Sequence, residues 1–161
     1  MSSERPADVV MRRLVSGGQT GVDRAALDAA MSLGIPCGGW CPRGRRADGG
    51  PIPRIYPLQE ASTSAYPQRT AWNVRDSDGT LVLTRGTPKG GTALTVHLAR
   101  RAGKPVQIVD LDGVPGSAEV SAWIERERIG TLNVAGPRES EAPGIHDQAV
   151  SFLRGLLSRY A

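Results

Sequence analysis

The chain has 161 residues, of which 39% are hydrophobic and 22% are charged, so it has the length and composition of one globular domain with its own core. No apolar run approaches the roughly 20 residues that cross a bilayer, and the polar start has no apolar signal segment, which predicts a cytoplasmic protein. The net charge of +4 suits an anionic ligand without requiring nucleic acid, and two cysteines with two scattered histidines predict no metal site.

Residues 1–8 are predicted to be a flexible tail and residues 9–161 to form a single domain. Apolar periodicity, glycines and prolines divide that domain into alternating strands and helices. The predicted order is strand 9–15, helix 22–33, a short strand within 35–40, an extended piece at 56–58, helix 65–74, strand 80–84, helix 93–102, strand 105–110, helix 118–128, strand 131–135 and helix 145–160.

This alternation predicts an α/β fold, with a mainly parallel sheet and helices on both of its faces. Three strands are followed by glycine-bearing polar turns, near residues 17, 90 and 136. Because the carboxyl ends of parallel strands lie at one edge of the sheet, we expect these turns to meet there and to bind a ligand.

The first turn, residues 16–21, leads from a strand into a helix and carries glycines at 17, 18 and 21. The first amides of a helix lack partners within it, and the helix dipole places partial positive charge beside them. The turn therefore predicts an anion site, although its spacing is neither that of dinucleotide folds nor that of a P-loop. The alternative is a tight connection in which Thr20 caps the helix and Asp23 completes a near capping box.

Residues 41–53 contain three arginines among six glycines and prolines, which predicts a long loop without regular structure. Arginines bind anions through paired donors, so the loop is a candidate rim of the site; the alternative is a solvated basic loop. Arg69 and Asn73 share a face of the next helix. The candidate ligand-binding residues are Ser16, Gly17, Gly18, Gln19, Thr20, Gly21, Asp23, Arg43, Arg45, Arg46, Arg69, Asn73, Gly90, Gly91, Thr92, Gly136 and Arg138.

Five stretches, residues 16–28, 38–42, 69–78, 90–92 and 133–138, together resemble the family of bacterial proteins named "putative molybdenum carriers". The resemblance runs from about residue 10 to residue 158. It implies a Rossmann-like domain in the superfamily of the lysine-decarboxylase-like, cytokinin-activating phosphoribohydrolases and the molybdenum cofactor carrier proteins. It also implies a homo-oligomer, and the molybdenum cofactor, molybdate or a nucleotide as ligand.

We therefore expect a carrier that binds a phosphate-bearing or oxyanionic small molecule. One alternative is a nucleotide-processing enzyme like the phosphoribohydrolases, with Asp23 as its acid or base. Against it, Thr95 stands where those hydrolases carry a catalytic glutamate, and this chemistry needs a positioned acid or base. The other alternative is a nucleic-acid-binding regulatory protein, which the sequence pI of about 9.6 permits. Only 4% of the residues are aromatic, which leaves few platforms for stacking bases.

Overall fold

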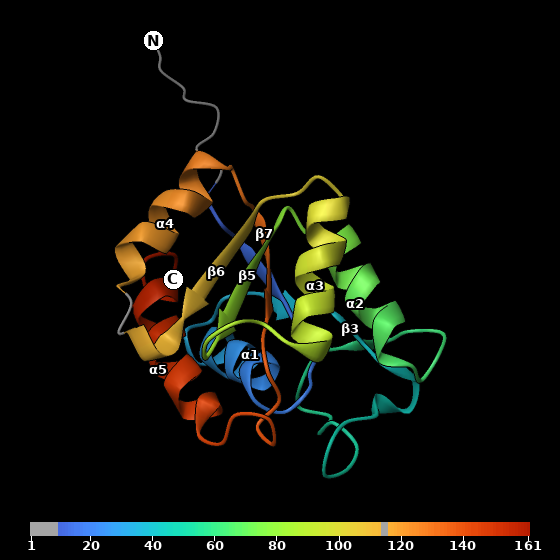
Figure 1. Ribbon diagram of the computed structural model, residues 1–161. Coiled ribbons are helices and arrows are strands. Elements are labelled where there is room, and N and C mark those ends of the chain that lie inside the picture. The colour runs from blue at the N-terminus through green and yellow to red at the C-terminus, as the bar shows by residue number, and fades with distance from the viewer. Residues whose placement is uncertain (1–9, 114–115) are drawn as a thin grey trace.

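Five strands form a parallel sheet in the order β2-β1-β7-β5-β6 in the computed structural model, which describes residues 10–113 and 116–161 (Figure 1). Their bounds are Arg13–Val15 for β1, Cys37–Gly38 for β2, Gly79–Thr84 for β5, Val106–Asp110 for β6 and Thr131–Ala135 for β7. A separate parallel pair joins β3 (Trp40–Cys41) to β4 (Gln59–Glu60). The tail predicted over residues 1–8 lies outside the described residues.

Helices cover both faces of the sheet, as Figure 1 shows. One face carries α1 (Val22–Ser32), α4 (Ser117–Arg126) and α5 (Ile145–Leu157), and the other carries α2 (Tyr66–Arg75) and α3 (Gly90–Arg101). Short 3₁₀ turns occupy Arg43–Arg45 and Leu111–Gly113. The architecture confirms the α/β, Rossmann-like prediction.

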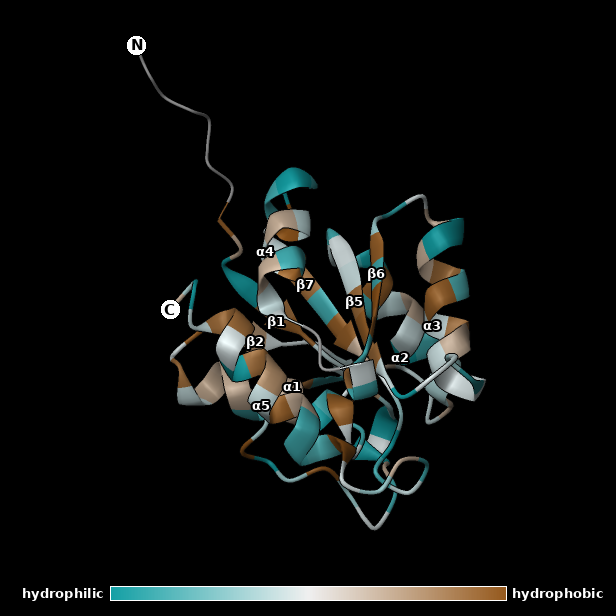
Figure 2. Ribbon diagram, turned by 60° about the vertical axis from the view of Figure 1, so that its left-hand side comes forward, coloured by the Kyte–Doolittle hydropathy of each residue, from teal (hydrophilic) through white to brown (hydrophobic). Residues whose placement is uncertain are grey.

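The two faces of the sheet differ in polarity. Leu14, Leu81 and Leu132 are fully buried in the large apolar core that α1 and α5 complete. Alternation along the strands turns their neighbours to the other face. That face buries Thr80 and Asn133, and the Asn133 amide donates to the Thr80 hydroxyl at 3.2 Å. Figure 2 shows hydrophobic colouring along β5 and β6, mixed colouring in β7, and hydrophobic patches on α1, α3 and α5.

Several element bounds differ from prediction for local reasons. The strand predicted over 9–15 begins only at Arg13, because the amides of Arg12 and Arg13 both donate to the Gly130 carbonyl. Helix α3 begins three residues before the predicted 93, because the Lys89 carbonyl already accepts from the amides at 92 and 93. Helix α5 ends at Leu157 rather than 160, in a tight turn.

This topology places the exits of β1, β5 and β7 at one edge of the sheet, where the loops gather below the strands in Figure 1. Strand β7 lies between β1 and β5 and is paired with both. The three glycine-bearing turns therefore meet at this edge, as the strand–helix alternation predicted. Within the described ranges, no helix is long and apolar enough to cross a membrane.

Candidate functional site

A cleft of about 260 Å³ opens at the carboxyl edge of the sheet. Its walls come from the exit of β1, the first half of α2, the start of α3 and the exit of β7. The sequence-predicted residues that line it are Gln19, Asp23, Arg69, Gly91, Thr92, Gly136 and Arg138. An adjoining hollow of about 270 Å³ shares Thr92 and Glu141 with the cleft and adds the cations Arg85 and Lys89.

The first turn does not present a row of open amides. The Gly18 amide donates to Ser16 Oγ at 3.4 Å, the Gln19 amide to Asp23 Oδ2 at 3.2 Å, and the Thr20 amide to Gln19 Oε1 at 3.1 Å. Side chains of Ser16, Gln19 and Asp23 thus occupy three of the amides predicted to form a cradle. The amides of Gly17 and Gly21 have no acceptor among the described residues, but neither glycine lines the cleft. The turn and the start of α1 instead bring the side chains of Gln19 and Asp23 to the cleft.

The capping alternative for this turn is corrected as well. Gly21, rather than Thr20, is the cap residue of α1, and no side chain caps the helix. The Thr20 hydroxyl instead accepts from the Glu139 amide at 3.3 Å, across to the exit of β7. Gly21 is required by that approach, because a Cβ there would lie 2.3 Å from the Pro137 carbonyl oxygen. The turn and the β7 exit are therefore packed as one unit.

Asp23 and Arg69 form a buried ion pair in the cleft wall. Arg69 Nη1 donates to Asp23 Oδ2 at 3.1 Å, with side-chain exposures of 14% and 4%. Burial raises the pKa of Asp23 above its ordinary value, against the opposing effects of Arg69 and the Gln19 amide. Arg69 lies directly over Gly17, where a Cβ would be 1.8 Å from Nη1. Gly17 thus makes room for the guanidinium.

The second turn differs because its donors remain open. No described residue accepts a hydrogen bond from the amides of Gly90 and Gly91, the first two residues of α3. The first turn of this 12-residue helix contains no acidic residue, so nothing within it neutralises the positive end of the dipole. Gly91 and Thr92 line the cleft. This helix start can therefore accept negative charge.

The third exit brings Gly136, Arg138 and Glu141 to the cleft. Gly136 fits closely between β5 and α1, since a Cβ there would lie 2.2 Å from the Leu83 carbonyl oxygen. Arg138 pairs with Asp48 at 3.2 Å and with Glu141 at 3.4 Å. Through Asp48, Arg138 joins the long loop to the cleft.

The other predicted cations lie elsewhere. Arg45 is buried inside the long loop and donates to the carbonyls of Ile52, Pro53 and Tyr56 at 2.8–2.9 Å, so it holds the loop together instead of forming a rim. Arg43 is exposed, and exposed Arg46 donates to the Ser64 carbonyl. None of these three lines the cleft.

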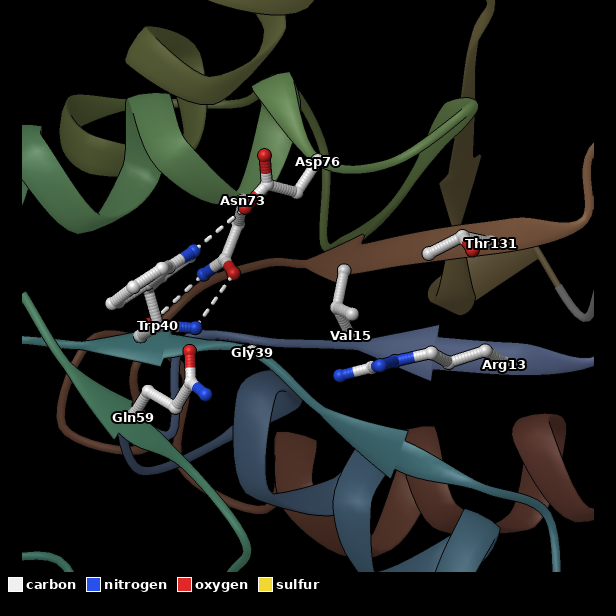
Figure 3. Close-up of a pocket in the computed structure, with 8 residues that line it drawn as sticks. All are labelled: Arg13, Val15, Gly39, Trp40, Gln59, Asn73, Asp76 and Thr131. Carbon is white, nitrogen blue, oxygen red and sulfur yellow. Dashed lines mark hydrogen bonds between the residues drawn. The ribbon is translucent and has the colours of Figure 1, made fainter.

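Asn73 also lies outside the cleft, although it shares a helix face with Arg69. Its side chain bonds both the amide and the carbonyl of Trp40, at 2.8 and 2.9 Å. It lines a different pocket (Figure 3). Asn73 therefore fixes β3 against α2.

Sequence reasoning missed Tyr66, Thr70 and Glu141, which also line the cleft. The first two could have been found in steps, because Tyr66 stands three residues before Arg69 and Thr70 stands four residues after Tyr66, spacings that place side chains next to each other on a helix. Glu141 lies beyond the last predicted turn, and only the Arg138 pair brings it in. Thr95 lines the cleft too, its hydroxyl donating to the Gly91 carbonyl at 3.1 Å.

Comparison with known proteins gave two matches. Residues 14–157 match the family model described as the "Circularly permutated YpsA SLOG family". A crystal structure of a "putative molybdenum carrier protein" from Syntrophus aciditrophicus SB is 44% identical in sequence, covers 92% of this chain and 96% of its own, and superposes with a TM-score of 0.86. The search of curated proteins gave no match.

Proposed function

This chain belongs to the circularly permutated YpsA SLOG family, and from that premise we propose that it carries a small molecule bearing a phosphate or another oxyanion. The ligand occupies the cleft at the carboxyl edge of the sheet. The name of the similar crystal structure, a molybdenum carrier, makes molybdate and the phosphate-bearing molybdenum cofactor the first ligands to test.

One observation supports the proposal: two neighbouring helices, α2 and α3, bring positive groups to the same cleft. The start of α3 offers the open amide of Gly91 beside the Thr92 hydroxyl, and the amide of Gly90, next to the cleft, is open as well. Arg69 approaches from α2, and its buried Nε has no acceptor among the described residues. Oxyanions are bound well by such combinations of helix-start amides and a guanidinium.

The Asp23–Arg69 pair suits a site that is filled and emptied. In the absence of a ligand, Asp23 balances the buried guanidinium. An arriving oxyanion competes for Arg69, and the raised pKa of Asp23 lets that carboxyl take up a proton at modest cost. Binding therefore strengthens as the pH falls toward the pKa of Asp23.

Gly91→Glu tests the proposal with little risk to the fold. A Cβ at Gly91 meets nothing within 4 Å, and an acidic residue in the first turn of a helix is favourable, but its carboxylate would repel an oxyanion. We expect molybdate and phosphate to raise the melting temperature of the wild type and to bind at least tenfold more weakly to the variant, by isothermal titration calorimetry.

Ala118→Glu is the matched control, because Ala118 occupies the same second position of α4, is exposed and lies outside the cleft. Equal loss of binding in both variants would mean that net charge, and not the start of α3, governs affinity. No binding of either anion or of the molybdenum cofactor to the wild type would refute the proposal.

A second function is favoured by Asp23, whose raised pKa and place in a cleft are typical of an acid or base in catalysis. It would act on a nucleotide-like substrate. Release of free base from nucleoside monophosphates by the wild type and not by Asp23→Asn would support this enzyme, and a flat result over a full panel would exclude it.

A further inference from the structure

A second pocket, of about 280 Å³, lies at the other end of α2 from the cleft. The cleft uses Tyr66, Arg69 and Thr70 of this helix, whereas the second pocket uses Asn73 and the following Asp76. The other walls come from β1, β3, β4 and the start of β7 (Figure 3). The two sites have no residue in common.

One wall of this pocket is fixed by hydrogen bonds. The Asn73 side chain accepts a hydrogen bond from the Trp40 amide and donates one to the Trp40 carbonyl. The Trp40 indole Nε1 donates to Asp76 Oδ2 at 2.8 Å (Figure 3). Arg75 neutralises Asp76 at 2.7 Å. This wall is therefore built in advance, with its charge balanced and its polar groups largely engaged.

Three other lining side chains keep their polar groups available. The side chains of Arg13, Gln59 and Thr131 make no hydrogen bond or ion pair with any described residue, and all three line the pocket (Figure 3). Arg13 extends along β1 toward Gly39, over Gly38, where a Cβ would lie 2.6 Å from its Nη2. The pocket thus carries one cation without an acid to balance it in the described part of the chain.

Apolar surface completes the pocket. Val15 lines it and is only 4% exposed, and the Trp40 ring lies on the Asn73 and Asp76 side, packed edge-on against Trp72 (Figure 3). The volume is just below the range usual for small-molecule sites, so it admits a compact ligand of about one ring.

We propose that this pocket binds a small organic carboxylate with a planar apolar body. The guanidinium of Arg13 matches a carboxylate with two parallel hydrogen bonds, and the Gln59 amide and the Thr131 hydroxyl supply further donors. Val15 and Trp40 receive the apolar part. This site is separate from the oxyanion cleft and takes a different chemical class of ligand.

Benzoate is the probe, added to the full-length protein labelled with ¹⁵N. We expect a saturable shift of the Trp40 indole signal with a Kd of about 1 mM or tighter, while the Trp123 indole, buried in the main core, stays unmoved. Assignment by Trp40→Phe identifies the signal. Absence of a saturable Trp40 shift would overturn the proposal.

Arg13→Gln is expected to weaken benzoate binding about tenfold, and Gln59→Ala about threefold. Arg12→Gln is the matched control, since Arg12 is the exposed neighbour on the same segment, carries the same charge and does not line the pocket. Equal losses at Arg12 and Arg13 would overturn the proposal by reducing it to general surface charge. Gly91→Glu leaves benzoate binding unchanged, which keeps this test independent of the oxyanion proposal.

Discussion

Two turns of this protein share one sequence pattern and differ in chemistry. Each leads from a buried strand through glycines into a helix, at residues 16–21 and at residues 85–92. In the first, oxygen atoms of Ser16, Gln19 and Asp23 already occupy the amides of residues 18–20, and the two amides left open, at positions 17 and 21, belong to residues that do not line the cleft. In the second, the amides of Gly90 and Gly91 have no acceptor among the described residues. A glycine turn before a helix therefore indicates donors, but nearby side chains decide whether a ligand can reach them.

The largest difference should appear when a methyl group is added to each turn. Gly21→Ala places a Cβ 2.3 Å from the Pro137 carbonyl oxygen, at φ +82°, and we expect it to lower the free energy of unfolding by more than about 3 kcal/mol. Gly91→Ala meets no atom within 4 Å, so we expect a gain of up to about 1 kcal/mol. Urea denaturation measures both. Similar losses would mean that the second turn is as tightly packed as the first.

Removal of Arg69 tests whether Asp23 in the first turn depends on that partner. Arg69→Met leaves a buried carboxylate without its counter-charge, which we expect to cost about 3 kcal/mol at pH 7.5. Burial already raises the pKa of Asp23, and without Arg69 that pKa rises further. The folded variant then binds a proton more readily than the unfolded chain, so its deficit shrinks as the pH falls through that raised pKa.

Urea denaturation of the Arg69→Met variant at pH 7.5 and pH 5 measures this recovery. Arg75→Met is the control, because its pair with Asp76 is exposed and its effect should not depend on pH in this way. A deficit in Arg69→Met that is constant with pH would show that lost packing, and not the unpaired carboxylate, explains the change.

The smallest expected difference separates two hydroxyls. Ser16→Ala removes a buried acceptor of the Gly18 amide and a donor to the Asp23 carbonyl, which we expect to cost about 2 kcal/mol. Thr92→Ala changes stability by less than about 0.5 kcal/mol, because no described residue bonds its hydroxyl, yet it weakens oxyanion binding. Urea denaturation measures the stability of both variants, and calorimetry measures their oxyanion binding. If Thr92→Ala lost stability and Ser16→Ala lost only binding, the second turn would be the structural one and the first the binding one.

Much of the fold follows from local sequence signals. Strand β7 has the predicted bounds and β5 begins one residue earlier than predicted, because both are short apolar runs between turn residues. The meeting of three strand exits also followed from the alternation of strands and helices. Local sequence patterns did not predict that β7 lies between β1 and β5, because strand order depends on contacts between distant segments.

The site was less accessible to sequence reasoning than the fold. Arginine-rich loops bind anions often enough that Arg45 was a reasonable candidate, but its acceptors are carbonyls 7 to 13 residues away. Only the folded path of the loop brings those oxygens around it. The hydrogen bonds from the amides of Gly18 and Gln19 to the side chains of Ser16 and Asp23 likewise depend on side-chain rotamers, which local sequence patterns do not predict.

The central place of β7 has a consequence for biosynthesis. During translation, the pairs β1–β2 and β5–β6 emerge first, and neither is hydrogen-bonded to the other until β7 arrives between them. A nascent chain that stops before Thr131 therefore holds two half-sheets with unprotected edges, which are prone to pair with other chains. Completion of the sheet awaits synthesis of Thr131–Ala135, so ribosome-bound fragments should need chaperone protection until then.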